Sequence, residues 1–123
     1  MNIFLVLAAG LSAFNTGLHL FAGGQAIARP LLEARSLPDT VRCVQYFCWH
    51  IATLALALQA AVFGVAAFMP GQAALAIVGT AFAAAIALLG IVLPPVLKIS
   101  YKTMPQGWLF VPVSALGLAG LVL

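Results

Sequence analysis

Charged positions divide the chain into three long apolar stretches. The five Lys and Arg residues and the two Asp and Glu residues all fall within 29–42 and 98–102. Residues 1–28, 43–97 and 103–123 carry no charged side chain. A helix that crosses a membrane needs about 20 mainly apolar residues. Each outer stretch therefore predicts one such helix, and the longer middle stretch predicts two.

Pairs of glycine and proline mark where three of these helices are expected to end. Gly23-Gly24 is a stop signal for the first helix. Pro70-Gly71 separates the second helix from the third. Pro94-Pro95 is expected to end the third, because proline cannot donate the backbone hydrogen bond that continues a helix.

Capping sequences mark two expected helix starts. The segments 36–39 (SLPD) and 103–106 (TMPQ) each place a hydroxyl three residues before a side chain that can complete a capping box. Pro112 should kink the last helix. The chain is predicted to be one all-α domain, 1–123, a four-helix integral membrane bundle with antiparallel up-down topology. The helices are expected at about 3–21, 37–69, 73–93 and 104–123.

The composition supports a membrane protein and excludes several other classes. Hydrophobic residues make up 65% of the chain and charged residues only 6%, whereas a typical soluble domain is about 45–50% apolar and about 25% charged. So few charges cannot cover a surface that faces water, which excludes soluble globular, disordered and nucleic-acid-binding proteins. The expected partner is the lipid bilayer, in which backbone polar groups must be paired within helices.

The distribution of basic residues predicts an orientation. All five Lys and Arg residues fall between predicted helices one and two or between helices three and four, and none lies near the termini or the 69–72 turn. Basic loops stay on the cytoplasmic side of a membrane. We therefore expect a multi-pass protein, as in a bacterial inner membrane, with cytoplasmic charged loops and both termini outside the cytoplasm.

Polar residues near the charged end form the candidate site. Asn15 and His19 are four residues apart and share one face of the first helix, and Tyr46 and His50 share a face of the second in the same way. Antiparallel neighbours would hold the two histidines at a similar depth. The candidate ligand-binding residues are Asn15, His19, Arg29, Arg42, Tyr46, His50 and Lys98.

Three functions fit this cluster. The first is a non-catalytic accessory subunit or binding module, because no nucleophile–base pair, zinc motif or phosphate loop favours an enzyme. The second is a redox protein that holds haem or a metal between His19 and His50. The third is a small carrier for an anionic or amphipathic ligand, with basic residues at the mouth of its site.

Stripes of small residues at four-residue spacing predict close helix packing. Such stripes serve packing within one bundle, a homo-oligomer, or docking onto a larger membrane complex, and the sequence leaves these alternatives open. The stripes are Ala9, Ala13 and Gly17; Ala57 and Ala61; Ala60 and Gly64; and Gly79, Ala83 and Ala87.

Overall fold

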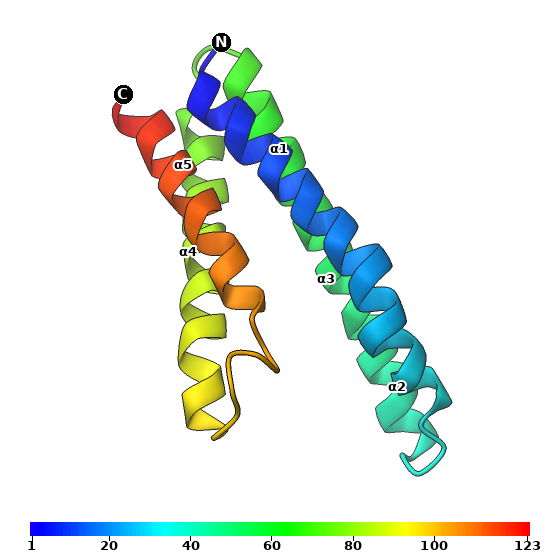
Figure 1. Ribbon diagram of the computed structural model, residues 1–123. Coiled ribbons are helices and arrows are strands. Elements are labelled where there is room, and N and C mark those ends of the chain that lie inside the picture. Colours follow the sequence, from blue (N-terminus) through cyan, green and yellow to red (C-terminus); the bar gives the residue numbers. More distant parts are fainter.

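The structure, a computed structural model of residues 1–123, is entirely helical, as predicted. Its segments are α1 (Ile3–Leu18), the π-helix η1 (His19–Ala28), α2 (Arg29–Glu33), α3 (Asp39–Phe68), α4 (Ala73–Val96), the 3-10 helix η2 (Gln106–Phe110) and α5 (Val111–Val122). The segments α1, η1 and α2 form one continuous helix, as do η2 and α5 (Figure 1). Three of the four resulting helices are long and apolar enough to cross a membrane, and the fourth, 106–122, is shorter.

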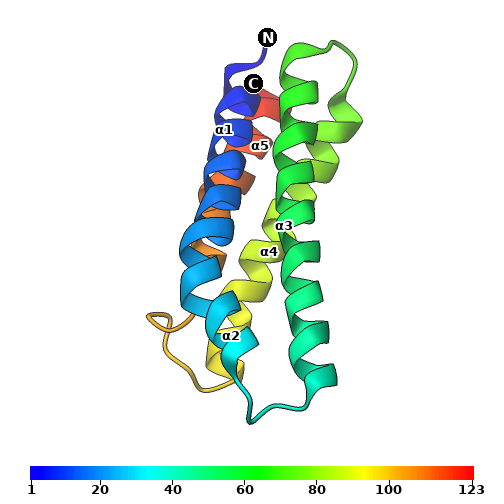
Figure 2. The ribbon, with the colours of Figure 1, turned by 90° about the vertical axis from the view of Figure 1, so that its right-hand side faces the viewer.

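Each of the four helices packs mainly against two others. The segment α1 lies against α3 and α5, and α4 lies against the same two. Both termini and the 69–72 turn lie at one end of the molecule, and the connections 34–38 and 97–105 lie at the other (Figures 1 and 2). The α1–α3 pair diverges from the α4–α5 pair towards the end with these two connections (Figure 1).

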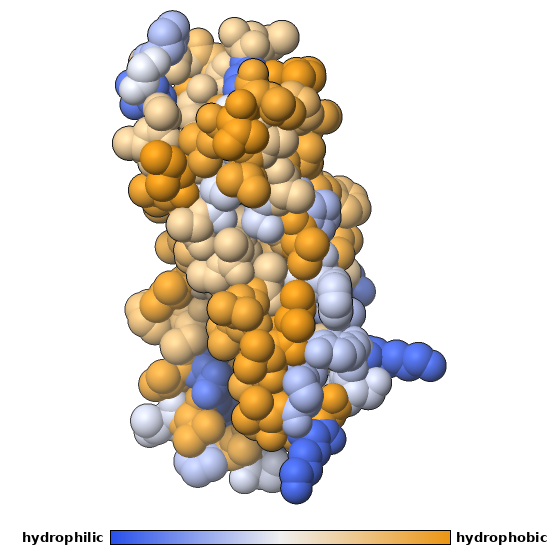
Figure 3. All heavy atoms as spheres, turned by 90° about the vertical axis from the view of Figure 1, so that its left-hand side faces the viewer, coloured by the Kyte–Doolittle hydropathy of each residue, from blue (hydrophilic) through white to orange (hydrophobic).

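The surface of the molecule is largely apolar. Many large hydrophobic side chains are exposed along all the long helices. On the face drawn in Figure 3, hydrophobic residues cover most of the surface, and the long charged side chains project near the lower end. The charged residues therefore gather at the end of the molecule opposite the two termini.

The predicted end of the first helix is wrong. The chain stays helical past Gly23 and Gly24 to Glu33, and neither glycine has the positive φ that ends a helix. The backbone instead widens into η1, where hydrogen bonds such as that from the Arg29 N–H to the Gly24 carbonyl span five residues. Because Gly23 lacks a Cβ, the Trp49 ring can approach this segment closely: a Cβ there would lie 2.7 Å from Trp49 Cη2.

Both predicted capping boxes are absent. Pro38 precedes α3 and Pro105 precedes η2, and no side chain caps either helix. The helix α3 begins at Asp39 and η2 at Gln106, so the hydroxyls of Ser36 and Thr103 lie too far before the first helical residue to serve as caps. Pro112 lies in the first turn of α5, next to the change from a 3-10 helix to an α-helix at Val111.

The third helix continues slightly beyond the two prolines that were expected to end it. It reaches Val96 and closes with a Schellman motif, in which the Ile99 N–H donates to the Pro94 carbonyl (2.9 Å) and the Lys98 N–H to the Pro95 carbonyl (3.1 Å). A proline lacks the donor but keeps the acceptor, so both prolines can end a helix from within its last turn. Lys98 has the left-handed conformation that this motif requires, with φ of 56°.

Glycines allow the helices to approach closely at two levels of the core. The ring of Phe63, which is fully buried, lies against both Gly79 and Gly117, where an added Cβ would lie 3.1 Å from ring carbons. Nearer the charged end, the backbone of Gly90 touches the backbone of Gly107. The Phe63 contacts join α3 to α4 and α5, and the contact between the two glycines joins η2 to α4.

Only one of the predicted small-residue stripes lies mainly inside the molecule. Gly79, Ala83 and Ala87 on α4 are buried, which confirms their role in internal packing. By contrast, Ala13 on α1 and Ala57 and Ala61 on α3 are exposed. Contact with a second copy or a larger complex through these outer faces stays a prediction.

Candidate ligand-binding site

Asn15 is a buried polar residue with one unused acceptor. It is 3% exposed, and its Nδ2 donates a hydrogen bond to the Leu109 carbonyl on η2 at 3.1 Å. Its Oδ1 is buried and has no partner. The bond to Leu109 fixes the orientation of the amide, because turning it over would place two oxygen atoms together. A buried acceptor without a partner costs about 1–3 kcal/mol.

His19 stacks on Trp49 of α3. Their ring centroids are 3.9 Å apart with an interplanar angle of 16°. His19 Nε2 lies 3.2 Å from the Trp49 backbone carbonyl. Since a carbonyl can only accept, Nε2 is the donor in this contact, and in the neutral tautomer protonated at Nε2 the other ring nitrogen, Nδ1, is an acceptor. The wide turn of η1 and the missing Cβ of Gly23 give this stacked pair its space.

A cavity of about 270 Å³ adjoins this pair. It lies where α1 and η1, α3, and η2 meet, and no charged side chain borders it. Its polar borders include Asn15, His19 and Gln106, and apolar groups form most of the remainder. The lining residues are Asn15, Leu18, His19, Ala22, Gly23, Ile27, Trp49, Leu56, Gln106, Leu109 and Phe110.

Trp49 also borders a second, smaller hollow that holds other members of the predicted cluster. This hollow has a volume of about 200 Å³ and is bordered by Arg29, Tyr46 and His50. The Tyr46 and His50 rings meet edge to face, with centroids 4.5 Å apart. Arg29 Nε donates to Glu33 Oε1 at 3.0 Å in an exposed ion pair. The basic side chain at this hollow is therefore already partnered.

The predicted cluster is thus distributed over separate places. Asn15 and His19 share one cavity, while Arg29, Tyr46 and His50 share the other. The two histidines lie at the same level, because His19 stacks on the residue next to His50, but they border different cavities. No group of three or more His, Cys, Asp and Glu side chains is placed to hold a metal ion. Haem or metal binding between the two histidines stays a prediction without a shared cavity to support it.

The two remaining basic candidates border neither cavity. Arg42 forms an ion pair with Asp39 at 2.6 Å. Lys98 occupies the left-handed position after α4. Trp49 and Leu109 are the neighbours of the site that sequence analysis missed. Helical spacing alone does not indicate that η2 packs beside Asn15, so no local signal identifies Leu109.

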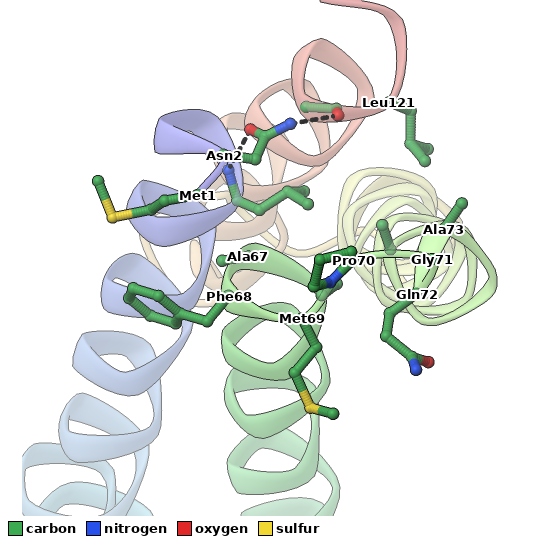
Figure 4. Close-up of a pocket in the computed structure, with 14 residues that line it drawn as sticks. Met1, Asn2, Ala67, Phe68, Met69, Pro70, Gly71, Gln72, Ala73 and Leu121 are labelled. Carbon is green, nitrogen blue, oxygen red and sulfur yellow. Dashed lines mark hydrogen bonds between the residues drawn. The ribbon is translucent and has the colours of Figure 1, made fainter.

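A larger cavity, of about 390 Å³, lies at the opposite end of the molecule beside the termini (Figure 4). Its principal polar side chain, Asn2, is fully engaged: Nδ2 donates to the Gly120 carbonyl at 2.8 Å, and Oδ1 accepts from the Leu5 N–H at 3.2 Å. The Asn2 N–H also donates to the Ala67 carbonyl at 3.0 Å. Asn2 therefore joins α1, α3 and α5, and its role is structural. An Asn directly before an apolar run is a helix-capping signal that could have identified it.

Comparison with protein-family models, curated proteins and solved structures finds no match for this chain.

Proposed function

We propose that the chain is a non-catalytic integral membrane protein that binds an amphipathic molecule from the bilayer in the cavity beside Asn15, His19 and Trp49. Three helices of membrane-crossing length and a largely apolar surface support insertion. The positive-inside rule assigns the charged end to the cytoplasm and both termini to the other side, as in a bacterial inner membrane.

The observation that carries the proposal is the buried acceptor of Asn15. Asn2, whose role is structural, has both ends of its amide paired, whereas Asn15 and Gln59 each keep a buried amide oxygen without a partner. In Asn15 only the nitrogen is paired, and the residue borders a cavity that is otherwise mainly apolar. Apolar cavities with a few polar groups are typical of small-molecule sites.

The charges favour a neutral ligand over the anionic one. Arg29 and Arg42 both have acidic partners within their own helical turns. The cavity at Asn15 has no basic residue on its border. An anion would therefore lose its hydration there without gaining a counterion. Ala22, Ile27 and Leu109, which border the cavity, are exposed on the surface of the molecule. The apolar tail of a ligand would leave the cavity beside these residues and extend into the lipid.

Fluorescence of Trp49 provides the test. In a Trp108→Phe background, Trp49 is the only tryptophan, and bromobenzene that enters the cavity should quench it in a saturable manner. Ala22→Phe should abolish the saturable part by filling the cavity. Ala13→Phe, an equal change at an exposed position of α1 that borders none of these cavities, should leave it intact. Quenching that rises linearly in all three proteins would refute a binding site here.

A further inference from the structure

The hydrogen-bonding pattern of the cavity specifies the chemistry of its ligand. We infer that the cavity selects a neutral, ring-sized head group that carries a hydroxyl donor, the class of the phenols and hydroquinones, with its O–H donating to Asn15 Oδ1. This inference rests on the proposed function and narrows it to one ligand class.

The hydrogen bonds around the cavity favour a ligand that donates. Asn15 Nδ2 donates to Leu109, and His19 Nε2 donates to Trp49, so both nitrogens are already in use. Among the buried polar atoms at the cavity, the one left without a partner is an acceptor, Asn15 Oδ1. Because Oδ1 is fully buried, the Asn15 amide must turn towards the cavity before it can accept from a ligand hydroxyl. An ether or ketone oxygen would gain no hydrogen bond from Oδ1.

The volume and the lining of the cavity limit which head group it can hold. An apolar cavity of about 150 Å³ holds a benzene ring, so 270 Å³ holds one substituted ring. Trp49, Phe110 and His19 offer aromatic faces and edges, against which a ring gains more than an alkyl group does. Since no charged side chain borders the cavity, the head group must be neutral.

A matched pair of probes isolates the hydroxyl. In the Trp108→Phe background, saturable quenching of Trp49 is measured with 4-bromophenol and with 4-bromoanisole, in which a methyl group replaces the donated hydrogen. We expect 4-bromophenol to bind about tenfold more tightly, the ratio that corresponds to about 1.4 kcal/mol, within the range for satisfying a buried acceptor. Both probes are measured in the same protein, so no residue that lines the cavity is substituted in this comparison.

A second comparison identifies the acceptor. Asn15→Leu should reduce the phenol-to-anisole ratio to about one by removing the acceptor. Thr16→Val also removes a polar group, but Thr16 bonds to the Ser12 carbonyl and does not border the cavity, so the ratio should stay near ten. A ratio that survives Asn15→Leu would overturn the assignment to Oδ1.

The outcomes separate this inference from the proposed function. Equal binding of the two probes, together with saturable quenching by bromobenzene, would overturn the hydroxyl selectivity and leave the binding site in place. Absence of saturable quenching by all three probes would overturn both.

Discussion

Replacing Gly90 by Ala tests whether backbone contact between α4 and η2 holds the molecule together. A Cβ at Gly90 would lie 2.7 Å from the Gly107 nitrogen and still closer to its Cα. Ordinary contacts are about 3.5–4 Å, so the two backbones would have to separate by roughly 1 Å. Such overpacking costs about 1–3 kcal/mol, and the better helix propensity of Ala returns up to about 1 kcal/mol. We expect a net loss of about 1–2 kcal/mol.

Gly64 provides the matched control, since it lies inside α3 and a Cβ there would meet nothing within 4 Å. Gly64→Ala should stabilise the protein by about 0.5–1 kcal/mol through helix propensity alone. Both variants are compared with the unchanged protein by denaturant unfolding in detergent micelles, followed by circular dichroism. Equal midpoints for Gly90→Ala and Gly64→Ala would refute the close contact.

Three further predictions concern the helix ends and the orientation. Asn2→Ala should cost about 0.5–2 kcal/mol by removing the cap that accepts from the Leu5 N–H as well as the bond to Gly120. Unchanged unfolding of Asn2→Ala would contradict the structural role of this side chain. Lys98→Gly should raise the unfolding midpoint, because a left-handed conformation costs a non-glycine residue about 1–2 kcal/mol; a lowered midpoint would contradict this. A reporter active only in the cytoplasm, fused to Leu123, should be silent, and full activity would reverse the proposed orientation.

Local signals in the sequence predicted the middle of the fold well. Pro70 cannot donate the hydrogen bond that continues a helix, and Gly71 favours a turn. The structure turns between Met69 and Gln72, with Gly71 at a φ of 79°. The prediction failed where tertiary contacts decide the outcome. Gly23 is compatible with either a stop or a continuing helix, and the Trp49 ring that packs on it favours continuation.

The contrast between local signals and tertiary contacts also explains how much of the site the sequence could predict. Four-residue spacing correctly paired Asn15 with His19 and Tyr46 with His50. Spacing does not determine how one helix is rotated against the next, so it could not show that the two pairs border different cavities. The rotation depends on packing at Trp49, which the sequence pattern indicates only as an aromatic residue near the charged end.

The position of a bound bromine atom would test the proposed site most directly. Crystals of the detergent-solubilised protein grown with 4-bromophenol would reveal the bromine by its anomalous scattering. The proposal predicts a peak in the cavity between η1, α3 and η2, with the phenol oxygen within hydrogen-bonding distance of Asn15 Oδ1. Bromine peaks confined to the outer faces of the helices, or to the cavity beside Asn2, would contradict it.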